Sequence, residues 1–261
     1  MSLSLARLRP QRQSAAGPVD PDAAVQLVDV TKTYRSGGGS VAALSSVSLR
    51  VPRAKFLAVM GRSGSGKSTL LHCAAGLDVP TSGSVAIGGT EVSRLSETER
   101  TLVRRARVGF VFQSYNLVPS LTIEHNITLP LRLAGSPVDH AWLESVVEHV
   151  GLSDHLQRMP SELSGGQQQR AAIARALAAG PDVIFADEPT GALDLQTATD
   201  VLSLLRDLTS SLSQTVVMVT HDPMAAAWAD DTVVMADGRI DQVLREPDAA
   251  TLAAVLGGYH S

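Results

Sequence analysis

A glycine-rich loop between an apolar run and a helical run constrains this chain most. The loop reads Gly-Arg-Ser-Gly-Ser-Gly-Lys-Ser at residues 61–68. The apolar residues before it, 56–60, are typical of a strand buried on both faces, and residues 68–75 have a helical pattern. A strand, a tight loop and a helix in this order predict an α/β domain with an anion site at the start of the helix.

The residue types in this loop suit a nucleotide phosphate. Glycines let the backbone N–H groups surround an anion, Lys67 reaches the outer phosphates, and Ser68 offers its hydroxyl to Mg²⁺. The alternative is a glycine-rich turn with a chance lysine, which the flanking strand and helix disfavour. The predicted nucleotide contacts here are Gly61, Arg62, Ser63, Gly64, Ser65, Gly66, Lys67, Ser68 and Thr69.

Two acids directly follow a second apolar run, 183–186. An acid at the end of a buried strand can hold a magnesium coordination sphere, which we assign to Asp187. Glu188 is then the better candidate for polarising the attacking water. Acids at the start of a loop are common, so this assignment depends on the phosphate loop earlier in the chain.

A third motif opens the helix predicted from Gly165 to Ala179. Ser164 is a possible N-cap for this helix, with Gly165 and Gly166 as loop residues. The functional alternative is a second anion site, because a helix start offers free N–H groups beside the serine hydroxyl. Spacing alone does not decide between a cap and an anion site.

Two further motifs are Gln113, which follows the apolar residues 110–112, and His221, which follows residues 216–220, so five motifs occur in one order. Together they resemble the ATP-hydrolysing subunit of ABC transporters, whose signature sequence LSGGQ is matched by residues 163–167. The resemblance covers roughly residues 25–243. It implies two protomers that sandwich two ATP molecules head to tail, so that each phosphate loop faces the partner's signature.

The resemblance also assigns roles residue by residue. Gln113 matches a glutamine that senses Mg²⁺ or water and the membrane partner, and His221 matches a histidine that contacts the terminal phosphate. Tyr34 matches the aromatic residue that stacks on adenine, and 191–194 matches the D-loop. The implied catalytic residues are Lys67, Gln113, Glu188 and His221, the implied metal contacts are Ser68, Gln113 and Asp187, and the implied signature contacts with nucleotide are Ser164, Gly165, Gly166 and Gln167.

The amino-acid sequences of three stretches resemble those of a narrower group, the lipoprotein-release, macrolide-export and cell-division ATPases. These stretches are 109–119, 164–170 and 186–191. His125 and Ala192 depart from that group, which usually has Glu and Asn there. Because the segment 113–126 is unusually apolar for a loop, we predict that it docks a membrane-subunit helix, with a local core as the alternative.

These patterns predict an α/β P-loop nucleotide-binding core with an antiparallel β portion and a helical insertion, the ABC ATPase fold. Buried strands are expected at 56–60, 183–186 and 216–219, a hairpin after 83–87, and a late hairpin through Asp237-Gly238. The predicted parts are a disordered tail 1–23, a first core part 24–95, a helical insertion 96–163, a second core part 164–245, and a C-terminal helix and tail 246–261.

Composition narrows the setting. The formal net charge is −4, so nothing overall drives binding to nucleic acid, and none is expected. Cys73 is the only cysteine and lies among apolar residues, which predicts a buried thiol. No apolar run approaches the roughly 20 residues of a membrane helix. Together with this lack of a membrane span, the resemblance implies a cytoplasmic ATPase that a separate permease subunit holds on the inner face of the cell membrane.

Two alternatives remain open at this stage. The first is a mechanical or signalling ATPase that acts on a membrane partner without moving a solute. The second is a soluble DNA-repair or translation ATPase of the same superfamily, which the absence of a coiled-coil insertion or a second ATPase copy disfavours. The transported substrate and the direction of transport do not follow from the residues.

Overall fold

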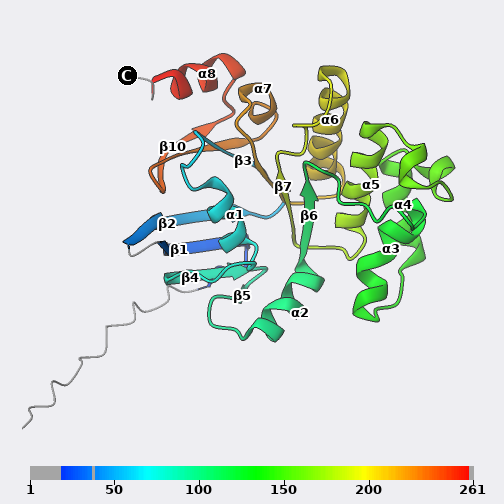
Figure 1. Cartoon of the computed structure of the whole chain (residues 1–261), viewed down its shortest axis with the longest axis horizontal. Helices are drawn as coiled ribbons and strands as arrows, with labels where there is room; N and C mark the ends of the chain where they lie inside the picture. Colours follow the sequence, from blue (N-terminus) through cyan, green and yellow to red (C-terminus); the bar gives the residue numbers. More distant parts are fainter. Residues whose placement is uncertain (1–18, 37–38, 259–261) are drawn as a thin grey trace, which may run out of the picture.

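The computed structural model describes residues 19–36 and 39–258, which form two β-sheets and the helices around them (Figure 1). The smaller, antiparallel sheet has the spatial order β2 (Gly39–Pro52), β1 (Ala23–Ser36), β4 (Ser82–Ile87) and β5 (Thr90–Glu91). The larger sheet has the order β10 (Arg239–Arg245), β9 (Asp231–Ala236), β3 (Phe56–Gly61), β8 (Val216–Val219), β7 (Val183–Asp187) and β6 (Val108–Phe112).

The larger sheet is parallel apart from its edge strand β10. Its central strand, β3, is buried along its whole length. Phe56, Ala58 and Met60 point into one hydrophobic core, whereas Leu57 and Val59 point into the other. This alternation follows from the period-two geometry of a strand. The predicted buried strands are confirmed, and β3 delivers the phosphate loop at its carboxyl end.

The helix that follows this loop, α1 (Lys67–Ala74), packs in the core between the two sheets. Leu70 and Leu71 are buried there. Cys73 is also fully buried, and burial followed by the charge of Asp78 raises the pKa of its thiol to about 11. The prediction of a buried thiol is confirmed, and its raised pKa disfavours the reactive thiolate.

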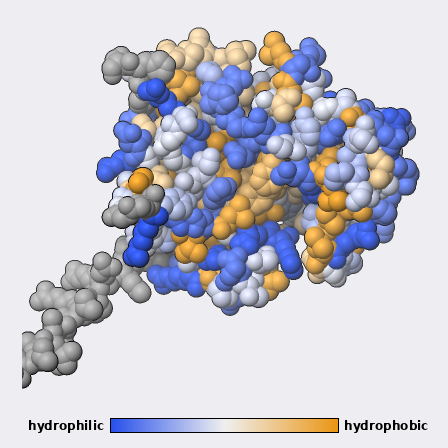
Figure 2. Space-filling view, viewed as in Figure 1, coloured by the Kyte–Doolittle hydropathy of each residue, from blue (hydrophilic) through white to orange (hydrophobic). Residues whose placement is uncertain are grey.

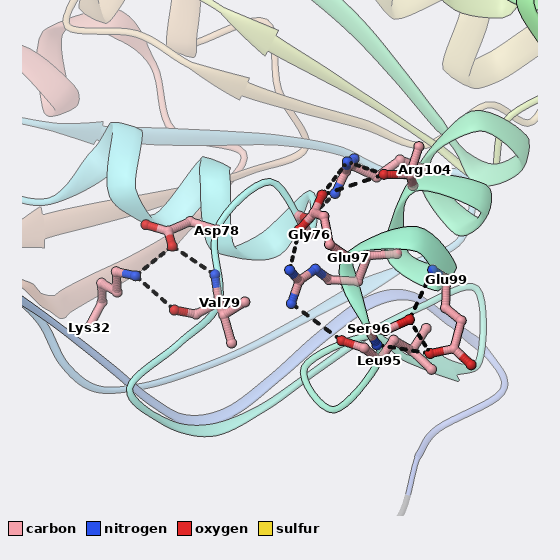
Figure 3. Close-up of polar contacts among 11 residues, drawn as sticks. Lys32, Gly76, Asp78, Val79, Leu95, Ser96, Glu97, Glu99 and Arg104 are labelled. Carbon is pink, nitrogen blue, oxygen red and sulfur yellow. Dashed lines mark hydrogen bonds and ion pairs between the residues drawn. The ribbon is translucent and has the colours of Figure 1, made fainter.

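The predicted insertion 96–163 includes two elements that belong to the core. The first, α2 (Glu97–Arg107), is helical throughout and has a capping box between Ser96 and Glu99. Arg104 ties it to the turn after α1 through the Gly76 carbonyl, at 2.7 Å (Figure 3). The second, β6, pairs with β7 in the larger sheet. The helical part proper therefore starts later than predicted, and comprises α3 (Ile123–Ala134), α4 (His140–His149), η1 (Ser153–His155) and η2 (Pro160–Glu162).

Two further helices cover the other face of the larger sheet. These are α5 (Gly165–Leu177) and α6 (Leu195–Ser211), with Asp194 as the N-cap of α6. The helix α5 ends two residues earlier than predicted, since Ala178 is its C-cap. A short helix, α7 (Pro223–Ala226), follows Asp222, and α8 (Ala249–Gly258) packs beside it.

The chain ends differ from the prediction in one respect. Most of the predicted tail 1–23 lies outside the described residues. Its last residues belong to the folded domain, because Ala23 begins β1 and Asp20 pairs with Arg50 of β2. Among the described residues, none of the helices has the length and apolar composition needed to cross a bilayer.

Candidate nucleotide site

The loop between β3 and α1 has the geometry of an anion cradle. Gly66 is the N-cap of α1 in the left-handed region, with φ of 101°, and no side chain caps this helix start. An added Cβ at Gly66 would lie 2.5 Å from the Ala43 carbonyl oxygen, so this position requires glycine. Lys67 folds over the loop and donates to the carbonyl oxygens of Gly61 (2.8 Å) and Arg62 (3.0 Å).

The donors of this cradle fit a phosphate. Open space surrounds Gly64, where an added Cβ would meet no atom within 4 Å. The buried Ser65 hydroxyl oxygen has no hydrogen-bond partner among the described residues. Because the start of α1 lacks a side-chain cap, its first backbone N–H groups remain available beside the Lys67 ammonium. Backbone N–H groups, a hydroxyl and a cation together suit an anionic oxygen ligand.

The carboxyl ends of β7 and β8 bring Glu188 and His221 into contact. Glu188 has a φ of 47°, which is uncommon for a residue other than glycine. Its Oε1 accepts from the His221 backbone N–H at 3.1 Å and lies 2.7 Å from His221 Nδ1. Its Oε2 accepts from the Thr220 hydroxyl at 3.2 Å. Both oxygens of the carboxylate are therefore oriented by the segment that follows β8.

Lys67, Glu188 and His221 line one cleft of about 670 Å³. The other lining residues are Gly61, Arg62, Ser63, Pro223, Ala253, Leu256 and Gly257. The last three belong to α8, so the C-terminal helix forms one wall of the cleft. The sequence analysis predicts a C-terminal helix but assigns it no role at the site. The only sequence feature that could have indicated such a role is a ten-residue stretch without charge.

The charged groups of the site are partly desolvated. Burial lowers the pKa of Lys67, against the opposing charges of Glu188 and Asp187. Burial also raises the pKa of Asp187, and the charge of Glu188 adds to this effect, while His72 and Lys67 oppose it. Ionisable groups whose pKa values are shifted by burial and by neighbouring charges in a cleft mark a candidate functional site.

The described residues contain no cluster of three or more His, Cys, Asp or Glu side chains that could hold a metal ion on its own. Oxygen donors are nonetheless at hand, since Ser68 follows Lys67 in the loop and Asp187 ends β7. Mg²⁺ commonly takes only one or two protein ligands and keeps waters and substrate phosphates. The donor set therefore fits Mg²⁺ accompanied by a phosphate.

The predicted site residues Gln113 and Tyr34 are among those that do not line this cleft. Gln113 is exposed and packs against the D-loop, since a Cβ on Gly191 would lie 2.8 Å from Gln113 Nε2. Tyr34 is 40% exposed on β1, and its hydroxyl donates to Asp78 at 2.8 Å. Neither residue lines the cleft around Lys67.

The signature residues also lie apart from the cleft around Lys67. Ser164 is the N-cap of α5, and its hydroxyl accepts from the Gln167 N–H at 3.3 Å while Gln167 Oε1 accepts from the Ser164 N–H at 2.9 Å. An added Cβ would lie 2.9 Å from the Tyr115 hydroxyl at Gly165 and 2.4 Å from Thr197 Cγ2 at Gly166. The capping interpretation of Ser164 is therefore confirmed, and the glycines make room for neighbours.

Comparison with known proteins decides the family. The family model described as ABC transporter matches residues 44–191. The chain belongs to the ABC transporter family. An uncharacterized ABC transporter ATP-binding protein of Thermotoga maritima is 47% identical over 85% of this chain and 95% of its own length. The bacitracin export ATP-binding protein BceA of Halalkalibacterium halodurans is 40% identical over 87% of this chain and 90% of its own.

A longer relative and a solved structure also place the chain in this family. The macrolide export ATP-binding/permease protein MacB of Burkholderia pseudomallei is 43% identical over 90% of this chain, which spans only 36% of MacB. The dimeric post-hydrolysis structure of the ATP-binding cassette MJ0796 with ADP and Pi is 39% identical, with a TM-score of 0.76 over 85% of this chain and 99% of that one. The predicted family and fold are confirmed, and the chain is an ATP-binding ATPase of an ABC transporter.

Three polar residues that sequence reasoning left without a role hold the loops of this ABC ATPase in place. Gln169 is fully buried, and its Nε2 donates to the carbonyl oxygens of Pro189 (2.6 Å) and Phe112 (3.4 Å). Arg175 donates to the carbonyl oxygens of Tyr115 and Asn116. The third is Asn126, described below. A signal was present for Gln169, because it falls on the face of α5 that carries Ala172 and Ile173.

The segment 113–126 is fixed largely by its own domain. Asn126 is fully buried and bonds to the backbone of Val118, Leu121 and Thr122. Leu117 is half-buried and packs against the larger core. His125, the departure from the narrower group, is exposed in the first turn of α3. The apolar character of Leu117 therefore has a local cause, whereas Pro119 and Ser120 are exposed.

Proposed function

We propose that this chain hydrolyses Mg²⁺-ATP as a head-to-tail homodimer and so drives a separate membrane-spanning subunit from the inner face of the cell membrane. The observation that carries the chemistry is the single cleft that joins Lys67, Glu188 and His221. Export is the favoured direction, because the relatives include proteins named for bacitracin export and macrolide export. The same names favour transport over a purely mechanical role.

In this proposal Lys67 and the free N–H groups at the start of α1 hold the β- and γ-phosphates. Glu188 takes the proton of the attacking water, since its carboxylate is already oriented by His221 and Thr220. With Nδ1 of His221 turned to Glu188, its Nε2 is the ring atom left for the terminal phosphate. Ser68, Asp187 and Gln113 would hold Mg²⁺, which neutralises charge on the phosphates.

The dimer supplies what one copy lacks. In a single chain the signature residues lie apart from the phosphate cleft, so the chain's own Ser164 does not complete its own site. A second copy placed head to tail would bring its Ser164–Gln167 to the open side of the cleft. The two dimeric structures of the similar cassette MJ0796 support the pairing of two copies.

Substitution of the proposed base tests the chemistry. Glu188→Gln keeps the size of the side chain but removes the base, so ATP binding should persist while hydrolysis falls by roughly 10²-fold or more. The ATP-bound variant should accumulate as a dimer in size-exclusion chromatography with light scattering. Glu148→Gln, at an exposed position of α4, is the control and should hydrolyse ATP normally. Wild-type turnover by Glu188→Gln would refute the assignment.

Docking of the membrane subunit on the segment 113–126 is the second part of the proposal. Because Leu117 packs against the core, Leu117→Glu should lower the melting temperature and is a poor probe of docking. Pro119→Glu changes an exposed position and should leave folding and basal ATPase intact. Loss of co-purification with the membrane partner in mild detergent would support docking, and retained, fully stimulated binding would exclude it.

A further inference from the structure

A largely buried ion pair joins the smaller sheet to the end of the phosphate-loop helix. Lys32 on β1 donates through Nζ to Asp78 Oδ1 and to the Val79 carbonyl oxygen at 2.8 Å (Figure 3). The two charged side chains are only 13% and 30% exposed. Asp78 lies four residues after α1, the helix that begins at Lys67. The pair therefore fixes β1 against the element that carries the phosphate loop.

The same pair holds the exposed aromatic ring of Tyr34. Lys32 and Tyr34 are two residues apart on β1, so their side chains leave the same face of the strand. Lys32 Nζ lies over the ring, 4.9 Å from its centroid. The Tyr34 hydroxyl donates to Asp78 Oδ2 at 2.8 Å. The ring is thus held at its hydroxyl and covered on one face by a cation, yet Tyr34 stays 40% exposed.

The ionisation states support this arrangement. Burial, and then the hydrogen bond to Asp78, raises the pKa of Tyr34, so its hydroxyl keeps the proton that it donates. Burial alone would raise the pKa of Asp78, but the hydrogen bonds from Lys32 and Tyr34 hold it below its ordinary value. Asp78 therefore remains a carboxylate that can accept from both partners.

An exposed ring held in this way is prepared to stack. A ring with fixed orientation loses little rotational freedom when a flat ligand covers it, which lowers the cost of binding. We propose that Lys32 and Asp78 are positioning residues for the base of the nucleotide: they hold Tyr34 so that its open face receives adenine, giving a stack of ammonium, phenol ring and purine. This inference rests on the proposed ATP-binding function and on the adenine-stacking role that the family resemblance implies for Tyr34.

The test compares a ligand that has a base with one that has none. Binding of ATP and of inorganic tripolyphosphate is measured by calorimetry on the full chain with Mg²⁺. Lys32→Met and Asp78→Asn should each weaken ATP binding about tenfold, or ~1.4 kcal/mol, and change tripolyphosphate binding less than about twofold. Lys32→Arg keeps the cation and should recover most of the ATP affinity.

A matched control comes from the same sheet. Arg50→Gln breaks the ion pair between β2 and Asp20, which does not involve Tyr34, and should leave both affinities unchanged. A melting temperature is recorded for every variant. If Lys32→Met and Asp78→Asn weaken both ligands equally, the pair supports the fold in general and the inference is overturned. If Lys32→Met is too unstable to measure, the ratio of ATP affinity to tripolyphosphate affinity in Asp78→Asn and Lys32→Arg decides the question.

Tyr34→Ala separates this inference from the function on which it rests. A fall in the ATP affinity of Tyr34→Ala, with tripolyphosphate unaffected, establishes that the ring binds the base. If the ratio of the two affinities then stays at the wild-type value in Lys32→Met and Asp78→Asn, only the positioning role fails. An unchanged ratio in Tyr34→Ala removes the adenine role of Tyr34 itself, and the positioning role with it.

Discussion

Two glycine-rich helix starts in this molecule look alike in sequence and differ in physical state. At the start of α1, no side chain caps the helix, and the glycines of the loop have positive φ. At the start of α5, Ser164 and Gln167 form a reciprocal capping box, and no positive φ occurs at Gly165 or Gly166. The start of α1 keeps free backbone N–H donors for a ligand, whereas at the start of α5 the capping box already bonds some of these N–H groups within the chain.

The surface around the start of α1 combines an uncharged wall with partly desolvated charges. Figure 2 shows hydrophilic and hydrophobic residues interleaved over the face on which α5, α7 and α8 lie. The part of α8 that lines the cleft is made of Ala253, Leu256 and Gly257, with no charge. The α1 side carries the desolvated Lys67 and Asp187, so it is the side on which an anionic ligand should matter most.

The largest effect is expected at Lys67. Lys67→Ala removes the only lysine of the loop and its charge-assisted hydrogen bonds to phosphate, so ATP binding and hydrolysis should fall by about 100-fold or more. Lys55→Ala is the matched control, since Lys55 is exposed just before β3, at the opposite end of that strand. ATP titration and phosphate release measure the outcome. Wild-type turnover in Lys67→Ala would mean that α1 does not hold the nucleotide.

Ser164 is the position where capping and function can be separated. Asp is as good an N-cap as Ser, so Ser164→Asp should keep α5 and the melting temperature close to wild type. A carboxylate would nonetheless repel the phosphates that the partner's loop presents in the proposed dimer. We expect ATP binding by the monomer to persist, and dimer formation and hydrolysis to fall by roughly tenfold or more.

Ser164→Asn is the neutral control for that variant, because it caps the helix without adding charge. It should lose much less activity than Ser164→Asp. If both variants hydrolyse ATP like the wild type, Ser164 does no more than cap α5, and the resemblance between the two helix starts ends at their sequence.

The phosphate loop and the buried strands could be predicted from the sequence because their causes are local. The apolar run 56–60, the glycines and Lys67 are adjacent in the chain, and the structure keeps them adjacent. The Asp194 cap and the helix after it are local in the same sense. The family resemblance added the family, which the comparisons confirm. The roles that it implies for the motif residues stay predictions.

What the sequence could not show depends on contacts between distant segments. The hydrogen bond from Gln169 to Pro189 spans twenty residues, and the wall that α8 adds to the cleft brings Ala253 to Lys67. No period or spacing encodes such contacts. The strand β6 was placed within a helical insertion for the same reason, since its pairing with β7 is visible only in the folded sheet.

The two sets of glycines give a third prediction, on stability. Gly166→Ala places a Cβ 2.4 Å from Thr197 Cγ2 and should cost about 1–3 kcal/mol by overpacking. Thr197→Ser removes that methyl group and keeps the hydroxyl that donates to Asp194. The double variant should therefore recover much of the loss, which denaturant unfolding would show as non-additivity.

Gly64→Ala is the counterpart on the α1 side. No atom lies within 4 Å of the added Cβ, so its cost of roughly 1–2 kcal/mol comes from a φ of 81° and no neighbouring truncation can relieve it. Gly64→Asn should be milder, because Asn tolerates the left-handed region better than Ala. If Thr197→Ser does not rescue Gly166→Ala, the glycines of α5 are needed for something other than space.

The smallest effect is expected from the pH dependence of stability at Asp187. Burial raises its pKa above the ordinary 3.8, so the folded state holds this proton to higher pH than the unfolded chain does. The contribution of this group to stability is therefore complete below about pH 3.8 and is lost as the pH rises through the folded pKa. Asp187→Asn removes the cost of burying this charge. The melting temperature of the variant minus that of the wild type should therefore be larger at pH 7.5 than at pH 4.

Asp194 should show the opposite sign. The hydrogen bond from the Thr197 hydroxyl, followed by that from the Thr197 backbone N–H, lowers its pKa, so its contribution to stability is present above the ordinary pKa and is lost as the pH falls through the lowered value. Asp194→Asn still caps α6, and should be less stable than wild type at pH 7.5 by a margin that shrinks toward acid. Thermal unfolding of both variants across this pH range checks the contrast. If the stability differences of Asp187→Asn and Asp194→Asn from the wild type changed with pH in the same way, burial of charge at Asp187 would not destabilise the phosphate-loop side more than it does the α6 cap.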